Sequence, residues 1–367
     1  MFHYWQGVPT RQAHKGIPEG QYEEEQGRDG FFGPVSHLIK KSPSTKWIEI
    51  DGPLKPHLYD LVLLKDLEQE KRLLYNNDVA ISMKQVKQTD ADKLYAYRNA
   101  DGDEVLFCHS GKGTIYTEYG CLTYVRSQYI CIPKCIAYVI DPDETSTFLK
   151  IESRTSRFIE PDRGIVGRHA VYDINALGRP ELEGQQQLFA EKNISIKKIK
   201  VKHGDQFTSF GFSDCAFDVT GWKGDFFPFT LHTDHMMPLM SHRAHLPPSA
   251  HTTFVARNFV ICTFLPRPLE EEKDALKVPF YHQNIDYDEV LFYHDGDFFS
   301  RDNLHAGMMT FHPAGFPHGP HPKAIEKIDQ KTRTDEYAVM VDTRFPLYVD
   351  NNLETVEVMD YWKSWMK

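Results

Sequence analysis

The sequence predicts an all-β protein of two related β-sandwich (jelly-roll) lobes, with an N-terminal arm and a C-terminal helix. Short runs of β-branched and aromatic residues alternate with Asp-Gly, Tyr-Gly and Pro turns, which is typical of a sandwich or barrel. The motif at residues 103–111 (DEVLFCHSG) returns at 288–296 (DEVLFYHDG), 185 residues later in a chain of 367. A repeat with so long a period indicates two copies of one domain. We expect the arm, the first lobe and a connector in residues 1–215, and the second lobe in residues 216–367.

Composition restricts the classes of function. With 41% hydrophobic and 13% aromatic residues the chain can bury a large core, and its net charge of -10 argues against nucleic acid or an anionic membrane as the main partner. The six cysteines form no Cys-x-x-Cys pair and have apolar neighbours, which favours reduced thiols. No apolar run approaches about 18 residues and no signal-like N-terminus is present. We therefore expect a soluble, cytoplasmic protein.

The first half of the chain divides into an arm and a series of strands. Residues 1–50 are rich in charge, Gly and Pro, and we expect them to wrap a neighbour or lie over the body. Residues 53–75 fit either a short helix or a strand with a charged turn. From position 79 the pattern predicts seven short strands, at 79–83, 104–108, 113–118, 121–125, 129–132, 137–140 and 148–151.

The second half begins with a connector at 161–180, rich in Gly, Arg and Asp. Isoleucines and a valine between lysines at 187–201 predict an edge strand with a basic outer face. Strand-like segments resume at 221 and continue to about 349. The spacing of apolar residues in 353–366 predicts a terminal amphipathic helix.

Eleven of the eighteen histidines lie between positions 232 and 321, and three residues there fit a metal site. Taken singly, each histidine is more often an ordinary hydrogen-bonded residue. However, His282, Glu289 and His318 supply two imidazoles and a carboxylate, which can occupy one face of an octahedron. The opposite face is then open for substrate and O2, as in non-haem Fe(II) oxygenases. At the same offsets the first copy has Tyr97 and Pro133, so we expect metal in the second lobe only.

Alternatives to this assignment remain open at this stage. Asp286 and Asp288 compete with Glu289, which we prefer because Glu-x6-Gly occurs in both copies and fixes the register. A Zn- or Mn-dependent isomerase or hydrolase would use a fourth protein ligand, for which His321 and Asn284 are the candidates. A non-catalytic binding or storage protein is a third possibility, but a pure scaffold has no reason to keep metal ligands in one copy only.

Longer motifs give a family resemblance. The duplicated Glu-x6-Gly turn and the Pro-x-Gly-x-Pro-His turn ending at His318 resemble a double cupin. Residues 97–104 with 115–120, residues 281–284 and residues 312–320 resemble the homogentisate 1,2-dioxygenase family, in particular its shorter bacterial branch. The similarity runs from about residue 20 to about residue 345.

The resemblance implies a specific reaction. The family binds one Fe(II) through two histidines and a glutamate, here His282, Glu289 and His318. It opens the ring of 2,5-dihydroxyphenylacetate (homogentisate) with O2 to give 4-maleylacetoacetate, a step in the breakdown of tyrosine and phenylalanine. His312 matches a histidine near the substrate. Because the family assembles through its arms, the resemblance also implies a homo-oligomer.

Three departures from the family pattern concern the substrate. A histidine of a Trp-His-Gly motif is Lys223 here, an arginine after the first iron histidine is Gln283, and a substrate-contacting tyrosine is Phe298. A different hydroquinone- or catechol-type acid therefore remains an alternative substrate.

Side chains near the metal residues supply candidates for the other roles. His312 and His321 are candidate bases because they lie close to His318 in the sequence, and Lys223 could serve if burial lowers its pKa. Tyr281 and Phe298 could stack on the ring of the substrate, although core packing is the more ordinary role for Phe298.

Overall fold

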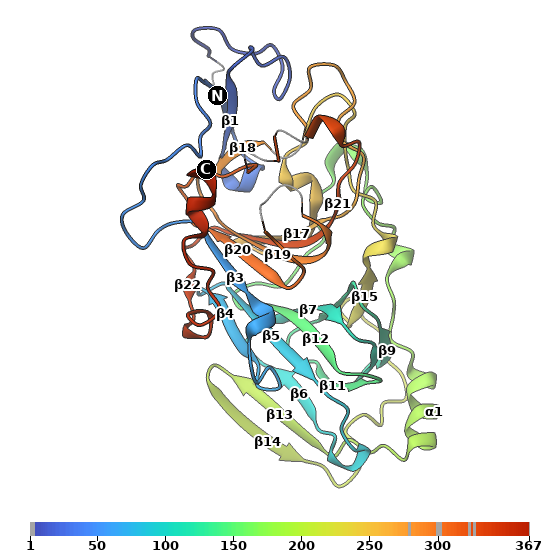
Figure 1. The fold of residues 1–367 in the computed structure, drawn as a ribbon. Coiled ribbons are helices and arrows are strands. Elements are labelled where there is room, and N and C mark those ends of the chain that lie inside the picture. Colours follow the sequence, from blue (N-terminus) through green and yellow to red (C-terminus); the bar gives the residue numbers. More distant parts are fainter. Residues whose placement is uncertain (1–3, 278–279, 299–302, 322–323, 326–327, 367) are drawn as a thin grey trace. The chain divides into compact units, whose positions relative to one another are not determined.

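The computed structural model describes residues 4–277, 280–298, 303–321, 324–325 and 328–366. Strands dominate these residues, as predicted (Figure 1). The chain divides into unit 1 (residues 1–64, 238–347 and 353–367) and unit 2 (residues 65–237 and 348–352). This division differs from the contiguous boundary that we expected at 215/216, because the arm belongs to the same unit as the second copy of the motif.

Unit 2 contains two sheets. One has the strand order β15-β10-β7-β12-β5-β4-β22 and the other β14-β13-β6-β11-β8-β9. Their bounds are β4 (Lys71–Tyr75), β5 (Val79–Val86), β6 (Ala96–Asn99), β7 (Asp103–Ser110), β8 (Gly113–Thr117), β9 (Gly120–Tyr124), β10 (Gln128–Ile132), β11 (Ala137–Pro142), β12 (Ser146–Ser153), β13 (Lys198–His203), β14 (Gln206–Gly211), β15 (Phe229–His232) and β22 (Tyr348–Val349). Each of the seven strands predicted between 79 and 151 overlaps one of these.

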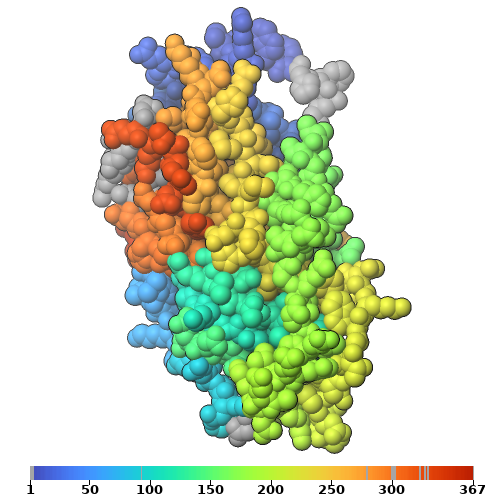
Figure 2. Space-filling model, turned by 90° about the vertical axis from the view of Figure 1, so that its right-hand side faces the viewer, coloured from blue at the N-terminus to red at the C-terminus, as the bar shows by residue number. Residues whose placement is uncertain are grey.

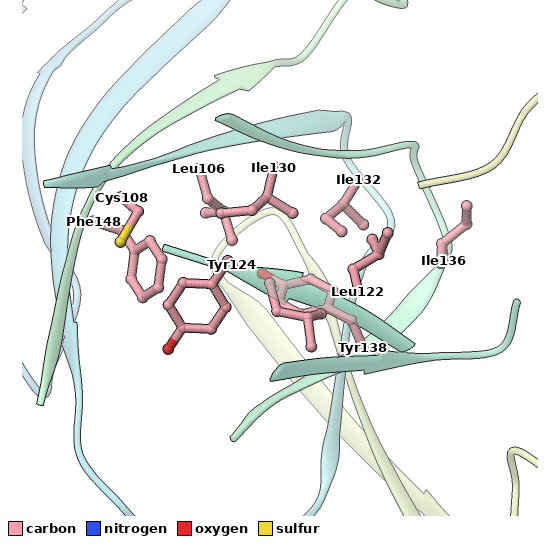
Figure 3. Close-up of a cluster of buried hydrophobic side chains, with 10 residues drawn as sticks. Leu106, Cys108, Leu122, Tyr124, Ile130, Ile132, Ile136, Tyr138 and Phe148 are labelled. Atoms are coloured by element: carbon pink, nitrogen blue, oxygen red, sulfur yellow. The ribbon is translucent and has the colours of Figure 1, made fainter. Parts of the chain in front are cut away.

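The core of unit 2 lies between its two sheets. Alternate residues of one sheet, among them Leu106 and Ile130, face Leu122 and Tyr138 of the other (Figure 3). Successive side chains of a strand point to opposite faces, so a strand between core and solvent shows the alternation found in the sequence. The arrangement is a β-sandwich.

Unit 1 also contains two sheets. Their strand orders are β16-β17-β21-β19-β20-β3 and β18-β1-β2. The bounds are β1 (Tyr22–Gly27), β2 (Val35–Lys40), β3 (His57–Asp60), β16 (Thr252–Val255), β17 (Phe259–Phe264), β18 (Tyr281–Asn284), β19 (Asp288–Asp297), β20 (Met308–His312) and β21 (Asp335–Thr343). The arm therefore contributes strands to this unit, and it also contacts later residues, since Lys15 forms a β-bridge with Ala275. In Figure 2 the blue atoms of the arm lie beside orange atoms of the second half of the chain.

The two units repeat one topology. The duplicated motif forms β7, which lies between β10 and β12, and β19, which lies between β20 and β21. Similarly, β6 pairs in parallel with β13, which continues to β14, and β18 pairs in parallel with β1, which continues to β2. The prediction of an all-β double lobe of the cupin type is confirmed.

Residues 187–201 depart from the predicted edge strand. Helix α1 (Leu182–Lys192) comes first, because its Leu, Glu, Gln, Ala and Lys residues are good helix formers, and it ends at Asn193 in a left-handed conformation (φ 53°). The strand that follows, β13, has β14 on its outer side, so β14 forms the edge.

The predicted terminal helix at 353–366 is also much shorter in the structure, a 3-10 helix over Tyr361–Met366. The segment before it hydrogen-bonds to β3 instead, since Asp60 N–H donates to Val356 O and Val358 N–H to Leu58 O. The short 3-10 helices are η1 (Asp29–Phe31), η2 (Leu61–Leu63), η3 (Ala91–Lys93), η4 (Gly164–Val166), η5 (Ile174–Ala176), η6 (Thr233–His235), η7 (Pro248–His251), η8 (Ile328–Gln330), η9 (Asn351–Leu353) and η10 (Tyr361–Met366).

Two expectations from composition can be compared with the structure. Within the described residues, no helix has the length and apolar character needed to span a membrane. None of the six cysteines, all of which are described, forms a disulfide bond.

Candidate metal centre

Unit 1 brings together the three residues that the sequence singled out. His282 lies on β18, Glu289 on β19, and His318 in the segment after β20. His282 and His318 form an antiparallel bridge in which each backbone N–H donates to the carbonyl of the other, both at 2.9 Å. One ligand-type atom from each of the three side chains lies within 4.8 Å of the other two.

The nitrogens and oxygens of the triad converge. His318 Nε2 lies 3.2 Å, and His282 Nε2 3.7 Å, from the same oxygen, Glu289 Oε2. The rings of the two histidines meet edge to face, with centroids 4.2 Å apart. All three side chains are largely buried, with exposed fractions of 12%, 7% and 3% for His282, Glu289 and His318.

Backbone carbonyls select the nitrogen that each histidine presents. His282 Nδ1 lies 3.0 Å from Phe280 O, and His318 Nδ1 lies 3.1 Å from Phe316 O. An Nδ1–H that donates to a carbonyl leaves Nε2 as the basic nitrogen, and metal-binding histidines are usually fixed in this way. Within the described part of the chain, His282 Nε2 is buried and has no hydrogen-bond partner.

The carboxylate of Glu289 is held in its charged form. Burial by itself raises the pKa of this group, but when His318 takes up a proton its charge, together with hydrogen bonds from the surrounding imidazoles, holds the pKa well below its ordinary value. Asp342, its partner on β21, behaves in the opposite way, because burial and the charge of Glu289 raise the pKa of Asp342 well above its ordinary value. The negative charge is therefore concentrated on Glu289.

His312 supports this carboxylate. Its Nδ1 lies 3.0 Å from Glu289 Oε1, the oxygen that does not face His318, and its ring stacks on that of His318 with centroids 4.5 Å apart. Carboxylates that bind metals are commonly oriented by such hydrogen bonds. The sequence placed His312 near the substrate, and the structure places it directly behind the triad.

The rival carboxylates have other partners. Asp286 accepts hydrogen bonds from Arg28 Nε and from the backbone of Asp29. Asp288 accepts from the backbone N–H groups of Ala314 and Leu347, both at 2.8 Å. These contacts hold loops in place, and they leave Glu289 as the carboxylate that faces the imidazoles.

The two candidates for a fourth ligand also have contacts elsewhere. His321 Nε2 lies 2.7 Å from the carbonyl oxygen of Ser364 in η10, and Asn284 donates to Asp342 at 3.2 Å. Neither contact involves the triad. The candidate donor set thus consists of His282, His318 and the Glu289 carboxylate, a number of donors that suits an open metal site better than a closed four-ligand one.

Of the predicted substrate residues, His312 contacts the triad, whereas Tyr281, Gln283 and Phe298 point away from it. Tyr281 and Gln283 alternate with His282 on β18, so their side chains point to the opposite face. Phe298 packs against Tyr293 in a core cluster, with ring centroids 4.8 Å apart. Lys223 is exposed in a loop of unit 2.

Other residues near the triad were missed. Phe31 and Phe280 place their rings 5.7 and 5.1 Å from that of His282. Glu25 of β1 pairs in register with His282. The only signal in the sequence was the run of three glutamates at positions 23–25, in an arm that otherwise shows little periodicity.

The donor set fits a divalent metal ion. Ligand atoms about 2.1 Å from a metal and at right angles to one another lie about 3 Å apart, close to the 3.2 and 3.7 Å observed here. His282 Nε2 is buried without a hydrogen-bond partner in the described residues, as expected of an atom that awaits a ligand.

Comparison with known proteins assigns the chain to a family. Residues 44–233 match the family described as homogentisate 1,2-dioxygenase N-terminal. The chain belongs to the homogentisate 1,2-dioxygenase family. It is 29% identical, over 100% of its length and 99% of the other chain, to a protein of Saccharolobus solfataricus provisionally named a dioxygenase. It is 25% identical to the homogentisate 1,2-dioxygenase of Drosophila melanogaster, over 74% of this chain and 64% of that one.

The coverage of the homogentisate 1,2-dioxygenases is partial. For the enzyme of Rhizobium leguminosarum bv. trifolii the identity is 24% over 73% of this chain and 61% of that one, so this chain spans less than two thirds of these relatives. Among solved structures, a cupin 2 conserved barrel protein from Leptotrichia buccalis matches with a TM-score of 0.39 and 12% identity over 81% of this chain and 99% of that one. A Bacillus subtilis oxalate decarboxylase variant matches with a TM-score of 0.38 and 11% identity over 84% and 81%. These scores are too low to bear on the site.

Proposed function

We propose that this chain is an Fe(II)-dependent ring-cleaving dioxygenase that converts homogentisate and O2 into 4-maleylacetoacetate. One observation carries the proposal: two histidines, each fixed by a backbone carbonyl, present Nε2 to one buried glutamate oxygen. The family named above supports the class of reaction. His282, Glu289 and His318 would hold the iron, which supplies the redox chemistry that allows O2 to react with an aromatic ring.

The protein contributes a proton acceptor beside this centre. Because His312 Nδ1 faces Glu289 Oε1, the basic nitrogen of the neutral ring is Nε2. We assign to this nitrogen the role of accepting the proton from a hydroxyl group of the substrate. The hydrogen bond at Nδ1 would then strengthen as the ring gains charge, since the partner is a carboxylate.

Aromatic side chains limit the access of water to the centre. Phe31 and Phe280 are both buried and lie against the His282 ring. A dry, apolar wall favours an aromatic substrate and strengthens the attraction between the charged groups. Tyr281 and Phe298, whose side chains lie elsewhere, would act through packing.

A second candidate substrate class is favoured by the departures from the family pattern. Lys223, Gln283 and Phe298 replace residues of the family, and the side chains of Gln283 and Phe298 point away from the triad. A different hydroquinone or catechol acid, such as gentisate, would use the same metal residues with other contacts to its carboxylate.

The test is O2 uptake by anaerobically iron-loaded protein, with homogentisate, gentisate and simple catechols in parallel. Rapid uptake with homogentisate and the appearance of maleylacetoacetate absorbance are expected. Uptake with another ring acid alone would keep the dioxygenase and change the substrate. If protein shown to hold iron consumed no O2 with any of these rings, the proposed function would be wrong.

A further inference from the structure

The N-terminal arm forms a second group of histidines and glutamates. One ligand-type atom each from His14, Glu23 and His37 lies within 4.8 Å of the other two, as in the triad described above. Glu23 and Glu25 lie two residues apart on β1 and therefore on one face. His37 pairs with Glu25 across β1 and β2, and His14 precedes β1. All four residues belong to unit 1.

The side-chain atoms of this group approach one another closely, and the backbone N–H of His14 donates to Glu23 Oε2 at 2.9 Å. His14 Nδ1 lies 3.0 Å from Glu23 Oε2, His14 Nε2 lies 3.2 Å from Glu25 Oε2, and His37 Nδ1 lies 3.2 Å from Glu23 Oε1. Within the described residues, however, His14 Nδ1, Glu23 Oε1, Glu25 Oε2 and His37 Nδ1 are buried atoms with no hydrogen-bond partner. The Nδ1 atoms of His14 and His37 thus both lie beside the carboxylate of Glu23, and Glu25 lies on the other nitrogen of the His14 ring. Buried donors and acceptors without a hydrogen-bond partner are expected where a ligand is to be bound.

Burial makes the charge of this group costly. The side chains of Glu23 and Glu25 are 0% and 4% exposed, and that of His14 is 4% exposed. Two buried carboxylates require a compensating charge. With both carboxylates ionised, the group therefore attracts a cation.

A divalent ion balances the group better than protons do. One such ion neutralises Glu23 and Glu25 while both imidazoles stay neutral. Two protonated rings would instead place like charges at His14 and His37, whose ring centroids are 5.1 Å apart. Protonation of His14 alone would leave a buried negative charge.

The equivalent positions in unit 2 lack these ligands. Strand β13 occupies the place of β1, and Lys200 pairs with Tyr97 as Glu25 pairs with His282. Lys200 in turn pairs with Ser209. The topology therefore does not require histidine and glutamate at these positions, and unit 1 has acquired them in addition to the fold.

We propose that His14, Glu23 and His37 bind a second divalent metal ion such as Zn(II), and that Glu25 lies beside them and completes the balance of charge. Imidazole and carboxylate are both ligands that Zn(II) accepts. The ion would join His14 to β1 and β2. Since β1 pairs directly with β18, it would also stabilise the strand that carries His282. The proposal does not depend on the identity of the metal or the reaction at the triad.

The test counts metal ions. Chelator-treated full-length protein is titrated with Zn(II) and, separately, with Co(II), and bound metal is measured by mass spectrometry after gel filtration. We expect two Zn(II) per wild-type chain, one for Glu23→Gln, one for His318→Ala and none for the double variant. Co(II) bound to His318→Ala should show the intense visible absorption of tetrahedral coordination. His169→Gln, whose side chain is 54% exposed, is the matched control and should keep both ions.

A second variant distinguishes the loss of a ligand from misfolding of the chain. His37→Gln changes the most exposed ligand of the group, 21% exposed, and should also reduce the count by one. Glu23→Gln and His37→Gln chains that both keep the wild-type count would overturn the proposal, as would a His318→Ala chain that binds no Zn(II). Failure of the proposed dioxygenase activity would leave these counts unchanged, so the two outcomes can be distinguished.

Discussion

The two lobes place the same glutamate in the same strand and use it in opposite ways. In unit 1, Glu289 faces His282 and His318. In unit 2, Glu104 Oε1 lies 2.7 Å from the ammonium nitrogen of Lys150, and both side chains are at most 2% exposed. The buried carboxylate thus needs a cation in both lobes. In unit 2 that cation is part of the chain, and in unit 1 we propose a metal ion in its place.

The other positions of the two sites correspond as well. Tyr97 pairs with Tyr138 across neighbouring strands as His282 pairs with His318. Tyr138 O–H donates to Glu104 Oε2 at 3.0 Å, where His318 Nε2 lies 3.2 Å from Glu289 Oε2. Two phenols and a lysine in one lobe therefore replace two imidazoles and a metal in the other. The comparison indicates that the fold itself requires the carboxylate and its counter-charge but not the metal.

We expect the largest effect on metal affinity and O2 uptake from replacing His318, and none from replacing Tyr138, its counterpart in unit 2. His318→Ala should lower metal affinity and O2 uptake by at least about 100-fold, because a ligand is lost and not merely a supporting contact. Tyr138→Phe, the matched change in unit 2, should leave both unchanged and remove only one hydrogen bond. Metal content and initial rates of O2 uptake are measured for both variants. Equal losses in the two would contradict the assignment of metal to unit 1.

Replacing the lysine should destabilise unit 2 without affecting the metal. Lys150→Met leaves the buried Glu104 carboxylate without its nearest cation, for which we expect a loss of about 3–5 kcal/mol in the free energy of unfolding. Methionine is a fair test because Met340 occupies the equivalent position on β21, opposite Leu291 as Lys150 is opposite Leu106. Denaturant unfolding gives the loss, and a change below about 1 kcal/mol would show that Lys150 does not balance Glu104.

His312 should act on the metal through Glu289. His312→Ala removes the hydrogen bond to Glu289 Oε1, and a loss of about 10–100-fold in metal affinity is expected. Ile132 is the residue at the equivalent position, opposite Glu104, and Ile132→Val should leave metal binding intact. If His312→Ala kept full metal affinity but its rate of O2 uptake no longer decreased at low pH, His312 would act as a base and would not be needed to orient Glu289.

The use of buried histidines should make unit 1 sensitive to acid. Burial is the largest cause that holds the pKa of His251 well below its ordinary 6.5. Below about pH 6.5 the unfolded chain takes up a proton at His251 that the folded chain does not. The contribution of neutral His251 to the free energy of unfolding is therefore full above that pH and is lost as the pH falls. The expected slope is about 1.4 kcal/mol per pH unit. His251→Phe should flatten the stability profile of metal-free protein between pH 6.5 and 5, and an unchanged profile would exclude His251 as the cause.

Local patterns made much of the fold predictable. The strands between 79 and 151 are short, alternating and bounded by turns, so the sequence located them. The triad was predictable because the repeated motif fixed the register of Glu289, and the structure brings His282 and His318 to it.

Pairing between distant residues could not be predicted in this way. Strands β1 and β2 lie in a charged arm. Strand β1 pairs with β18, more than 250 residues later in the chain, and β2 pairs with β1. The repeat offset of 185 also fails after the motif: Ile132 and His312, opposite the two glutamates, are only 180 residues apart. The counterpart of His318 is consequently Tyr138 and not Pro133. Helix α1 was missed because its second half, from Gln187, was assigned to one strand together with the isoleucines at 194, 196 and 199 that follow the helix.

The most direct test of the account compares the two glutamates. Wild-type, Glu289→Gln and Glu104→Gln proteins are loaded with Fe(II) without oxygen, freed of excess iron, and measured for bound iron and for O2 uptake with homogentisate. The account predicts that Glu289→Gln loses iron and uptake together, while Glu104→Gln keeps both and unfolds at a lower denaturant concentration than wild type. Iron retained by Glu289→Gln at the wild-type level, or lost from Glu104→Gln, would contradict the central claim.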